Sequence, residues 1–277
     1  MYFCNQTNNR KRMKLLKIFI IVIAAFSFAG SAYAENSADS TKSKKKTRVI
    51  KRVFKSYNNC KKDAGSCTYF DLSYQVVKSG NARSTINETI QDSLLKAVNI
   101  WDNKKPADFK EAAVNFIAEY TKSLKEQTNG SSWYLETDGR VNANRTNVLS
   151  YRITQSMYTG GAHPNSYTTF YNFDKANGNQ ITLSTIFGTN YESALNKIID
   201  ANFRKMKGLS ATDNLQEKAG LFENKITYTK NFAIEKKGLR FYYNSYDIAP
   251  YVYGPTEVMV SWKDLKDVMP DASYYSK

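Results

Sequence analysis

The sequence is poor in the residues that hold metals and phosphates. It contains one histidine, His163, and three cysteines among 277 residues. Zinc sites built from several histidines are therefore excluded by count, and no H-E-x-x-H pair occurs. Glycine-rich phosphate loops and dinucleotide-binding fingerprints are absent too. The sequence predicts neither a metal nor a cofactor.

Long hydrophobic runs are also lacking. Residues 18–30 form an apolar run of 13 residues, which is too short to cross a hydrocarbon core of about 30 Å as a stable helix. Five basic residues precede this run, and Ala32-Tyr33-Ala34 follows it with the small-x-small pattern of a signal peptidase site. We therefore expect residues 1–34 to be an export signal and the mature chain to be periplasmic or extracellular. An uncleaved membrane anchor is the alternative.

Acidic residues are outnumbered by basic ones, 25 against 40. Removal of residues 1–34 would leave 35 basic and 25 acidic residues. Such an excess attracts polyanions over long distances. Because no nucleic-acid-binding motif is present, the expected partners are wall polymers, lipid headgroups or acidic glycans, and not nucleic acid.

The basic excess is concentrated in residues 42–55, which hold eight basic and no acidic residues. Residues 35–47 are small, polar and basic, which predicts a flexible linker that leads into a first strand. Two interpretations stay open for this run. It is either a solvated tether or an arm that binds an anionic envelope polymer.

Cysteine usage favours a disulfide between Cys60 and Cys67, which are separated by six residues. Exported proteins meet oxidising conditions, in which a pair at this spacing closes a small loop. Closure would contribute about 2–3 kcal/mol on the chain-entropy model. A metal site would need two further ligands, which a chain with one histidine supplies poorly.

Hydrophobic periodicity predicts an α+β fold made of two units, each an antiparallel sheet with helices packed on one face. The expected domains are residues 48–150 and 151–277. Strands are expected at residues 66–78, 133–136, 148–158, 167–173, 227–234, 239–243 and 257–260.

Helices are expected after two capping boxes, Thr85 with Glu88 and Thr189 with Glu192, and after Pro106. The second helix is expected to bury an apolar face that includes Leu124. Shorter helices are expected at residues 214–222 and 262–269. Asp138-Gly139 and residues 177–179 are expected to form turns, and Gly208 is expected to end the third helix.

His163 lies in the segment Tyr158-Thr159-Gly160-Gly161-Ala162-His163-Pro164-Asn165. Gly160 and Gly161 permit positive φ angles and Pro164 stiffens the exit, so a shaped loop between strands is expected. His163 is either structural, with a ring nitrogen bonded to a nearby carbonyl, or a general base oriented by Asp247.

A second motif holds five tyrosines within residues 242–253, together with two prolines and a glycine in residues 250–255. Tyr246, Tyr251 and Tyr253 in such a rigid loop favour a surface that stacks on sugars or binds a protein. The alternative is that these rings fill space between a sheet and a helix.

These two motifs carry a family resemblance. The strings GGAHPN and YDIAPYVYGP, within residues 158–187 and 239–262, resemble the extracellular domain of RsiV-type anti-sigma factors. They also resemble the accessory region that precedes the catalytic part of PdaC-type peptidoglycan deacetylases. Residues 67–95 are similar to the smaller domain that usually precedes this extracellular domain. The resemblance therefore covers about residues 65–270.

The resemblance implies a shared envelope-facing module, which in RsiV-type proteins recognises lysozyme. Neither a sigma-binding segment nor a deacetylase domain with its Asp and two His ligands is expected here. The sigma-factor and deacetylase roles are therefore not expected to transfer.

Three functions are considered. The first is a non-catalytic module that recognises a wall glycan or a wall-acting protein such as lysozyme, through Tyr158, Gly160, Gly161, His163, Tyr246, Asp247, Tyr251 and Tyr253. The second is a wall-sugar hydrolase or deacetylase that uses His163 and Asp247. The third is a spacer whose basic linker clings to anionic surfaces. Because lysozymes are often basic, the positive charge of this chain favours an anionic wall ligand.

Overall fold

The computed structural model describes residues 46–62, 66–101, 104–126, 130–269 and 271–277. The expected export signal and most of the expected linker lie outside these residues. Within the described part, no helix combines the length and the apolar character that a membrane span requires. The described residues form a five-stranded sheet, a three-stranded sheet and six α-helices. The expected α+β class is confirmed.

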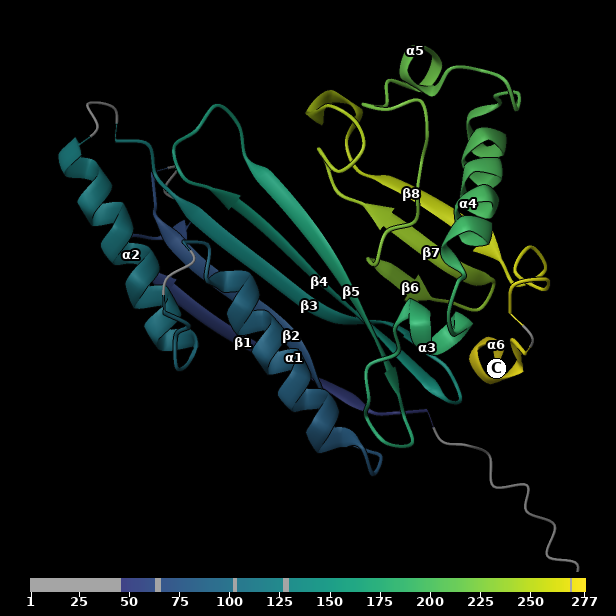
Figure 1. Ribbon diagram of the computed structural model, residues 1–277. Helices are drawn as coiled ribbons and strands as arrows, with labels where there is room; N and C mark the ends of the chain where they lie inside the picture. Colours follow the sequence, from purple (N-terminus) through teal and green to yellow (C-terminus); the bar gives the residue numbers. More distant parts are fainter. Residues whose placement is uncertain (1–45, 63–65, 102–103, 127–129, 270) are drawn as a thin grey trace, which may run out of the picture. The chain divides into compact units, whose positions relative to one another are not determined.

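The larger sheet has the order β1 (Val49–Tyr57), β2 (Tyr69–Val77), β3 (Tyr134–Asn144), β4 (Val148–Tyr158) and β5 (Asn165–Asp174). One pairing departs from the expected antiparallel pattern, because β2 and β3 run parallel. Parallel neighbours need a crossover connection, and α1 (Arg83–Val98) and α2 (Phe109–Glu126) supply it. Both helices cover the same face of this sheet (Figure 1).

The core of this part lies between the sheet and the two helices. Phe70 and Leu72 of β2 pack with Ile90 of α1 and Phe116 of α2, and each is at most 1% exposed. Full burial of such a side chain contributes about 1.5–3 kcal/mol. Side chains alternate between the two faces of a strand. The strand residues that alternate with those of the core, such as Asp71 between Phe70 and Leu72, therefore point to the opposite face of the sheet, which the helices do not cover. We call it the open face.

The smaller sheet consists of β6 (Phe232–Ile234), β7 (Gly238–Tyr243) and β8 (Thr256–Ser261), all antiparallel. It packs against α4 (Glu192–Lys207), which lies along it in Figure 1. The other helices of this part are α3 (Leu183–Phe187), α5 (Leu215–Ala219) and α6 (Ser273–Ser276). Gly208 ends α4 in a left-handed conformation, as expected.

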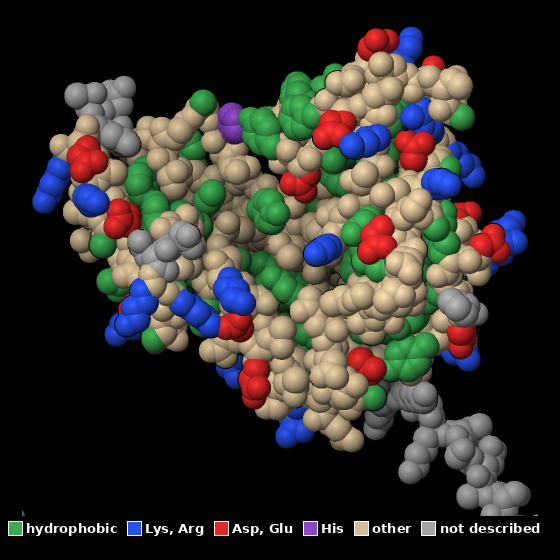
Figure 2. Space-filling view, in the orientation of Figure 1, with side chains coloured by type: hydrophobic (Ala, Val, Ile, Leu, Met, Phe, Trp, Pro, Cys, Tyr) green, Lys and Arg blue, Asp and Glu red, His purple; other side chains and the backbone are tan. Residues whose placement is uncertain are grey.

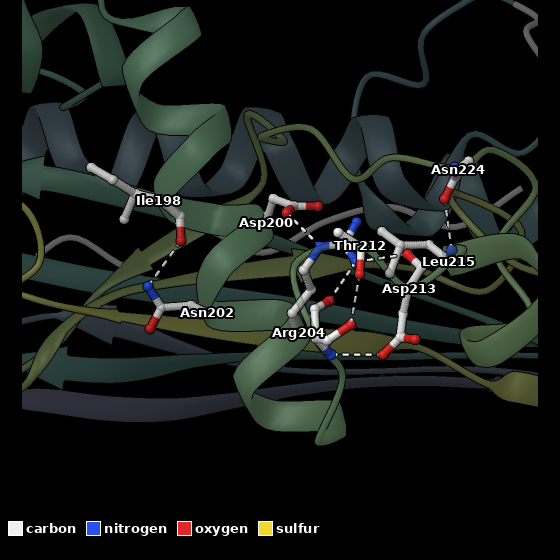
Figure 3. Close-up of polar contacts among 9 residues, drawn as sticks. Ile198, Asp200, Asn202, Arg204, Thr212, Asp213, Leu215 and Asn224 are labelled. Atoms are coloured by element: carbon white, nitrogen blue, oxygen red, sulfur yellow. Dashed lines mark hydrogen bonds and ion pairs between the residues drawn. The ribbon is translucent and has the colours of Figure 1, made fainter.

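Arg204 holds the connection between α4 and α5 in place (Figure 3). Its Nε donates to Asp200 Oδ2 at 2.6 Å, and its Nη1 donates to the carbonyl oxygens of Ser210 and Asp213. The side chain of Asn214 then caps α5 by accepting from the backbone amides of Gln216 and Glu217. This network fixes α5, against which the tyrosine-rich loop packs.

Asparagine side chains join the two sheets. Asn172 of β5 donates to Phe232 O at 2.8 Å and accepts from Ile234 N at 2.9 Å, so it bonds to β6 as a backbone would. Asn231 and Asn244 bond in the same two-way manner to the backbone of β5. The free edge of β5 is therefore covered by side-chain amides.

Several local expectations are wrong. The capping side chains expected at Thr85 and Thr189 are not used, because α1 begins after Ala82 and α4 after Tyr191. The turn at Gly80, with φ +104°, starts α1 before Thr85 is reached. A true capping box lies at Thr182 and precedes α3.

The expected turn at Asp138-Gly139 lies inside β3 instead. A Cβ on Gly139 would lie 2.6 Å from Tyr151 Oη, so this glycine serves close packing and not a turn. Leu124 is exposed on α2, where burial was expected. Residues 262–269 form turns and no helix, and only 232–234 of the expected strand 227–234 pair.

The expected domain boundary between residues 150 and 151 falls inside β4. That strand pairs with β3 and β5 along its length, so the change from one sheet to the other comes after Asp174.

Candidate functional site

The two loops that the sequence analysis singled out meet in the structure. The ring of His163 stacks on that of Tyr251, with centroids 4.0 Å apart and planes 23° apart. Tyr251 Oη also donates to Pro164 O at 3.0 Å. Figure 2 shows the single histidine side chain at the surface with hydrophobic side chains beside it.

The structure does not bring His163 and Asp247 into contact within the described residues. His163 Nδ1 lies 2.9 Å from Pro164 O. Asp247 Oδ2 instead accepts from Asn244 N at 2.7 Å, which closes a turn in its own loop. The geometry therefore gives the suggested catalytic pair no orienting hydrogen bond.

Tyr246 has an unusual backbone. Its φ of 72° lies in the left-handed region, and its side chain is 53% exposed. Its ring lies 5.7 Å from that of Tyr251. A non-glycine residue in this region costs about 1–3 kcal/mol, and such strain concentrates at functional sites.

The other predicted residues shape the loops. Gly160 has φ +85°, and a Cβ on Gly161 would meet open space. Tyr253 packs on Gly220, the glycine that ends α5: a Cβ there would lie 2.1 Å from Tyr253 Cζ. The tyrosine-rich loop is thus anchored to α5 through Tyr253.

A row of tyrosines crosses four strands on the open face. Tyr57, Tyr69, Tyr134 and Tyr158 are successive register partners on β1, β2, β3 and β4. Their ring centroids are 6.2, 5.8 and 6.3 Å apart. Only Tyr158 was predicted as a site residue. The others were missed because register, which is set by pairing, aligns residues from distant strands.

The row adjoins the two loops. The pKa of Tyr134 is raised by burial, then by the charge of Glu136 and by the neighbouring Tyr251. We call the row together with His163, Tyr246 and Tyr251 the ring surface. It is carried by paired strands and by a loop with several fixed contacts, so its rings are preorganised.

A polar hollow of about 330 Å³ lies next to the row on the open face. Lys62 Nζ bonds to Asp71 Oδ2 at 3.0 Å and to Glu136 Oε1 at 2.6 Å. Tyr69 Oη donates to the same Glu136 oxygen at 2.9 Å. Burial and this hydrogen bond raise the pKa of Tyr69 to about 12.

The expected disulfide sets the position of Lys62. Cys60 and Cys67 are bonded, with Cα atoms 5.5 Å apart, and Lys62 lies in the loop that they close. Its ammonium sits 4.6 Å from the centre of the Tyr69 ring. The hydrogen bond to Glu136 is the largest cause of the raised pKa of Lys62, so both carboxylates face a firmly protonated amine.

This arrangement offers a ligand both stacking and hydrogen bonding. Tyrosine rings offer flat apolar area at low entropic cost, and their hydroxyls and the polar hollow offer hydrogen bonds. No group of three or more metal-ligating side chains occurs among the described residues.

Comparisons with known proteins divide the chain into two segments. Residues 59–166 match the family model described as "Deacetylase PdaC", and residues 184–263 match that described as "Protein of unknown function (DUF3298)". The peptidoglycan-N-acetylmuramic acid deacetylase PdaC of Bacillus subtilis is 22% identical over 165 residues, which cover 59% of this chain. The chain spans 35% of that relative's length.

Two solved structures share the fold. A DUF3298 family member from Bacteroides fragilis has a TM-score of 0.68 at 22% identity, covering 84% of this chain and 99% of that one. A DUF3298 family protein from Pseudomonas aeruginosa has a TM-score of 0.64 at 15% identity, covering 84% and 98%. The PdaC part of the resemblance is confirmed, whereas the likeness to RsiV-type proteins stays a prediction. The two matched segments are consistent with the accessory region of PdaC-like proteins.

Proposed function

We propose that this protein is a non-catalytic binding module of the bacterial cell envelope and that it holds a wall glycan on the ring surface. The observation that carries the proposal is the row of four tyrosines in register across β1–β4, continued by the stacked His163 and Tyr251. A row of this kind presents successive half-buried rings and hydroxyls, along which an extended chain of sugar rings can lie.

The envelope location is supported by two further observations. The Bacillus subtilis relative is named for an action on peptidoglycan, although the chain covers only part of that protein. The Cys60–Cys67 bond is of the kind that persists in oxidising compartments outside the cytoplasm. Both support a periplasmic or extracellular position.

The proposal is tested by the retention of the purified protein on peptidoglycan sacculi. We expect Tyr251→Ala to weaken retention about tenfold, because it removes a stacking ring and the partner of His163. Tyr274→Ala is the matched control. Tyr274 is 38% exposed and Tyr251 is 37% exposed. The hydroxyl of each tyrosine donates a hydrogen bond, from Tyr251 to Pro164 O and from Tyr274 to Asp174 Oδ2.

Tyr274 bonds to Asp174, at the end of β5 opposite to His163, so its loss is expected to leave retention unchanged. Equal retention of Tyr251→Ala and the wild type would contradict the proposal. So would a wild type that binds lysozyme but not sacculi, because the ligand would then be a wall-acting protein.

A further inference from the structure

Arg152 is a half-buried arginine on β4 that no described partner satisfies. Its Nε is inaccessible to solvent and has no hydrogen bond. In the described part of the chain, its guanidinium forms neither an ion pair nor a hydrogen bond. Buried polar groups in proteins are nearly always paired, so an unpaired guanidinium calls for an explanation.

The surroundings of Arg152 make the missing partner more conspicuous. Arg152 lies directly opposite Arg140 of β3 in the sheet register, and like charges in that position destabilise a sheet. Arg140 is paired with Asp138 at 3.0 Å. On β7, Arg240 is paired with Glu235 and Glu257. Each of these two neighbouring guanidinium groups thus has a carboxylate of its own, whereas no carboxylate of the described residues lies within hydrogen-bonding distance of Arg152.

Arg152 also belongs to the open face. Tyr151 and Ile153 are buried against the helices, so Arg152 points the other way, together with Tyr158 of the ring surface. Across β5 its partner is Phe170, which packs against Tyr242 with ring centroids 5.7 Å apart. Burial and the charge of Arg140 lower the pKa of Arg152, and the opposing effects of Asp138 and Tyr242 are smaller.

We propose that Arg152 binds a carboxylate of an acidic glycan chain lying on the open face. The inference rests on the proposed function, because it assigns a chemical class to the same ligand. A guanidinium presents a fork of donors that matches a carboxylate in two-point contact. Arg152 lies six residues from Tyr158 along β4, about 20 Å. A ligand that reaches both is therefore an oligosaccharide and not a single sugar.

The test measures the binding of three defined probes by titration calorimetry. They are hexagalacturonate, its methyl ester and an oligomer of glycerol phosphate. We expect the wild type to bind hexagalacturonate more tightly than the ester. Arg152→Gln should weaken binding of the acid about tenfold to a hundredfold and leave binding of the ester unchanged. Arg152→Lys should be intermediate, because it keeps the charge and loses the fork.

Arg83→Gln is the matched control, since Arg83 is exposed at the start of α1 and its loss changes the net charge equally. Thermal unfolding of Arg152→Gln should occur at or above the wild-type temperature, because the change removes an unpaired charge. A strongly destabilised variant would show that Arg152 is structural and overturn the inference.

The remaining outcomes separate this inference from the proposed function. Unchanged binding of hexagalacturonate by Arg152→Gln overturns the inference, even if sacculi retain the protein through the rings. Binding of the phosphate oligomer with equal affinity and equal dependence on Arg152 overturns the carboxylate assignment. Binding of hexagalacturonate through Arg152 without retention on sacculi supports the anion site and overturns the wall ligand.

Discussion

At the scale of the residue, Tyr246 and Arg152 each break a local rule. Tyr246 holds a left-handed φ of 72°, and Arg152 buries a guanidinium nitrogen without a partner. Neither residue is the one that would stabilise the fold best. Asparagine would fit the left-handed backbone at position 246 better, and a neutral side chain would fit the buried site at position 152 better. Residues of this kind are expected where binding and stability are in conflict.

We expect Tyr246→Asn to separate these two effects. The melting temperature should stay equal or rise, because asparagine tolerates the left-handed region, while retention on sacculi should fall with the loss of an exposed ring. Tyr274→Asn should lower the melting temperature, because it loses the bond to Asp174. It should leave retention unchanged, because Tyr274 lies outside the ring surface. Calorimetric melting and a retention assay would check both variants. A lower melting temperature with full retention for Tyr246→Asn would show that the ring is structural.

At the scale of the element, short contacts between neighbouring segments set the shape of the loops. The tyrosine-rich loop depends on the end of α5, where Gly220 has φ +69° and supports the ring of Tyr253. Gly208 ends α4 in the same left-handed conformation, with φ +66°, but a Cβ on it would meet no atom within 4 Å. The two glycines therefore share a backbone requirement and differ in packing.

Alanine substitution at each of the two glycines separates the cost of packing from the cost of the backbone conformation. Gly208→Ala should lower the free energy of unfolding by about 1 kcal/mol, the cost of a left-handed alanine. Gly220→Ala should cost more, because the added methyl group displaces Tyr253, and it should also weaken retention on sacculi. Denaturant unfolding of both variants measures the difference. Equal losses would mean that Tyr253 moves aside freely and does not anchor the loop.

At the scale of the whole described molecule, side-chain amides hold the two sheets together. Asn172 is 1% exposed, and its donor and acceptor both bond to β6. An amide can do this because its two ends match a carbonyl oxygen and a backbone amide. A carboxylate of the same shape cannot, because one of its oxygens would face Phe232 O.

Asn172→Asp should therefore lower the free energy of unfolding by about 3 kcal/mol at neutral pH. Burial would raise the folded-state pKa of the introduced carboxyl above its unfolded value. The penalty should be complete above that raised pKa and should shrink as the pH falls through it, because the protonated acid can donate to Phe232 O. Asn165→Asp, at an exposed position, is the control. Urea unfolding at several pH values measures both, and a penalty that does not vary with pH would contradict this account.

The fold was predictable where the signal is local. Residues 148–158 alternate clearly and form β4 with those bounds, and Gly208 ends α4 as its backbone freedom suggests. Helix starts were less predictable, since Thr85 and Thr189 fit a capping pattern that the chain does not use. Asp138-Gly139 matched a turn signal, but packing against Tyr151 placed it inside a strand.

The candidate site was predictable in part. His163 and Tyr251 stand in motifs dense in glycine, proline and tyrosine, and such motifs are visible in one dimension. Tyr57, Tyr69 and Tyr134 are single tyrosines in ordinary strands, so nothing local distinguishes them. Arg152 is likewise one arginine among many until its neighbours are known.

The sequence by itself determined the α+β class, the cysteine pair and the two loops, because each depends on residues close together along the chain. Only the tertiary structure decided that the loops stack on each other, that four tyrosines form one row and that Arg152 has no carboxylate bonded to it among the described residues. These features depend on strand register and on burial, which arise when segments distant in sequence pair and exclude water.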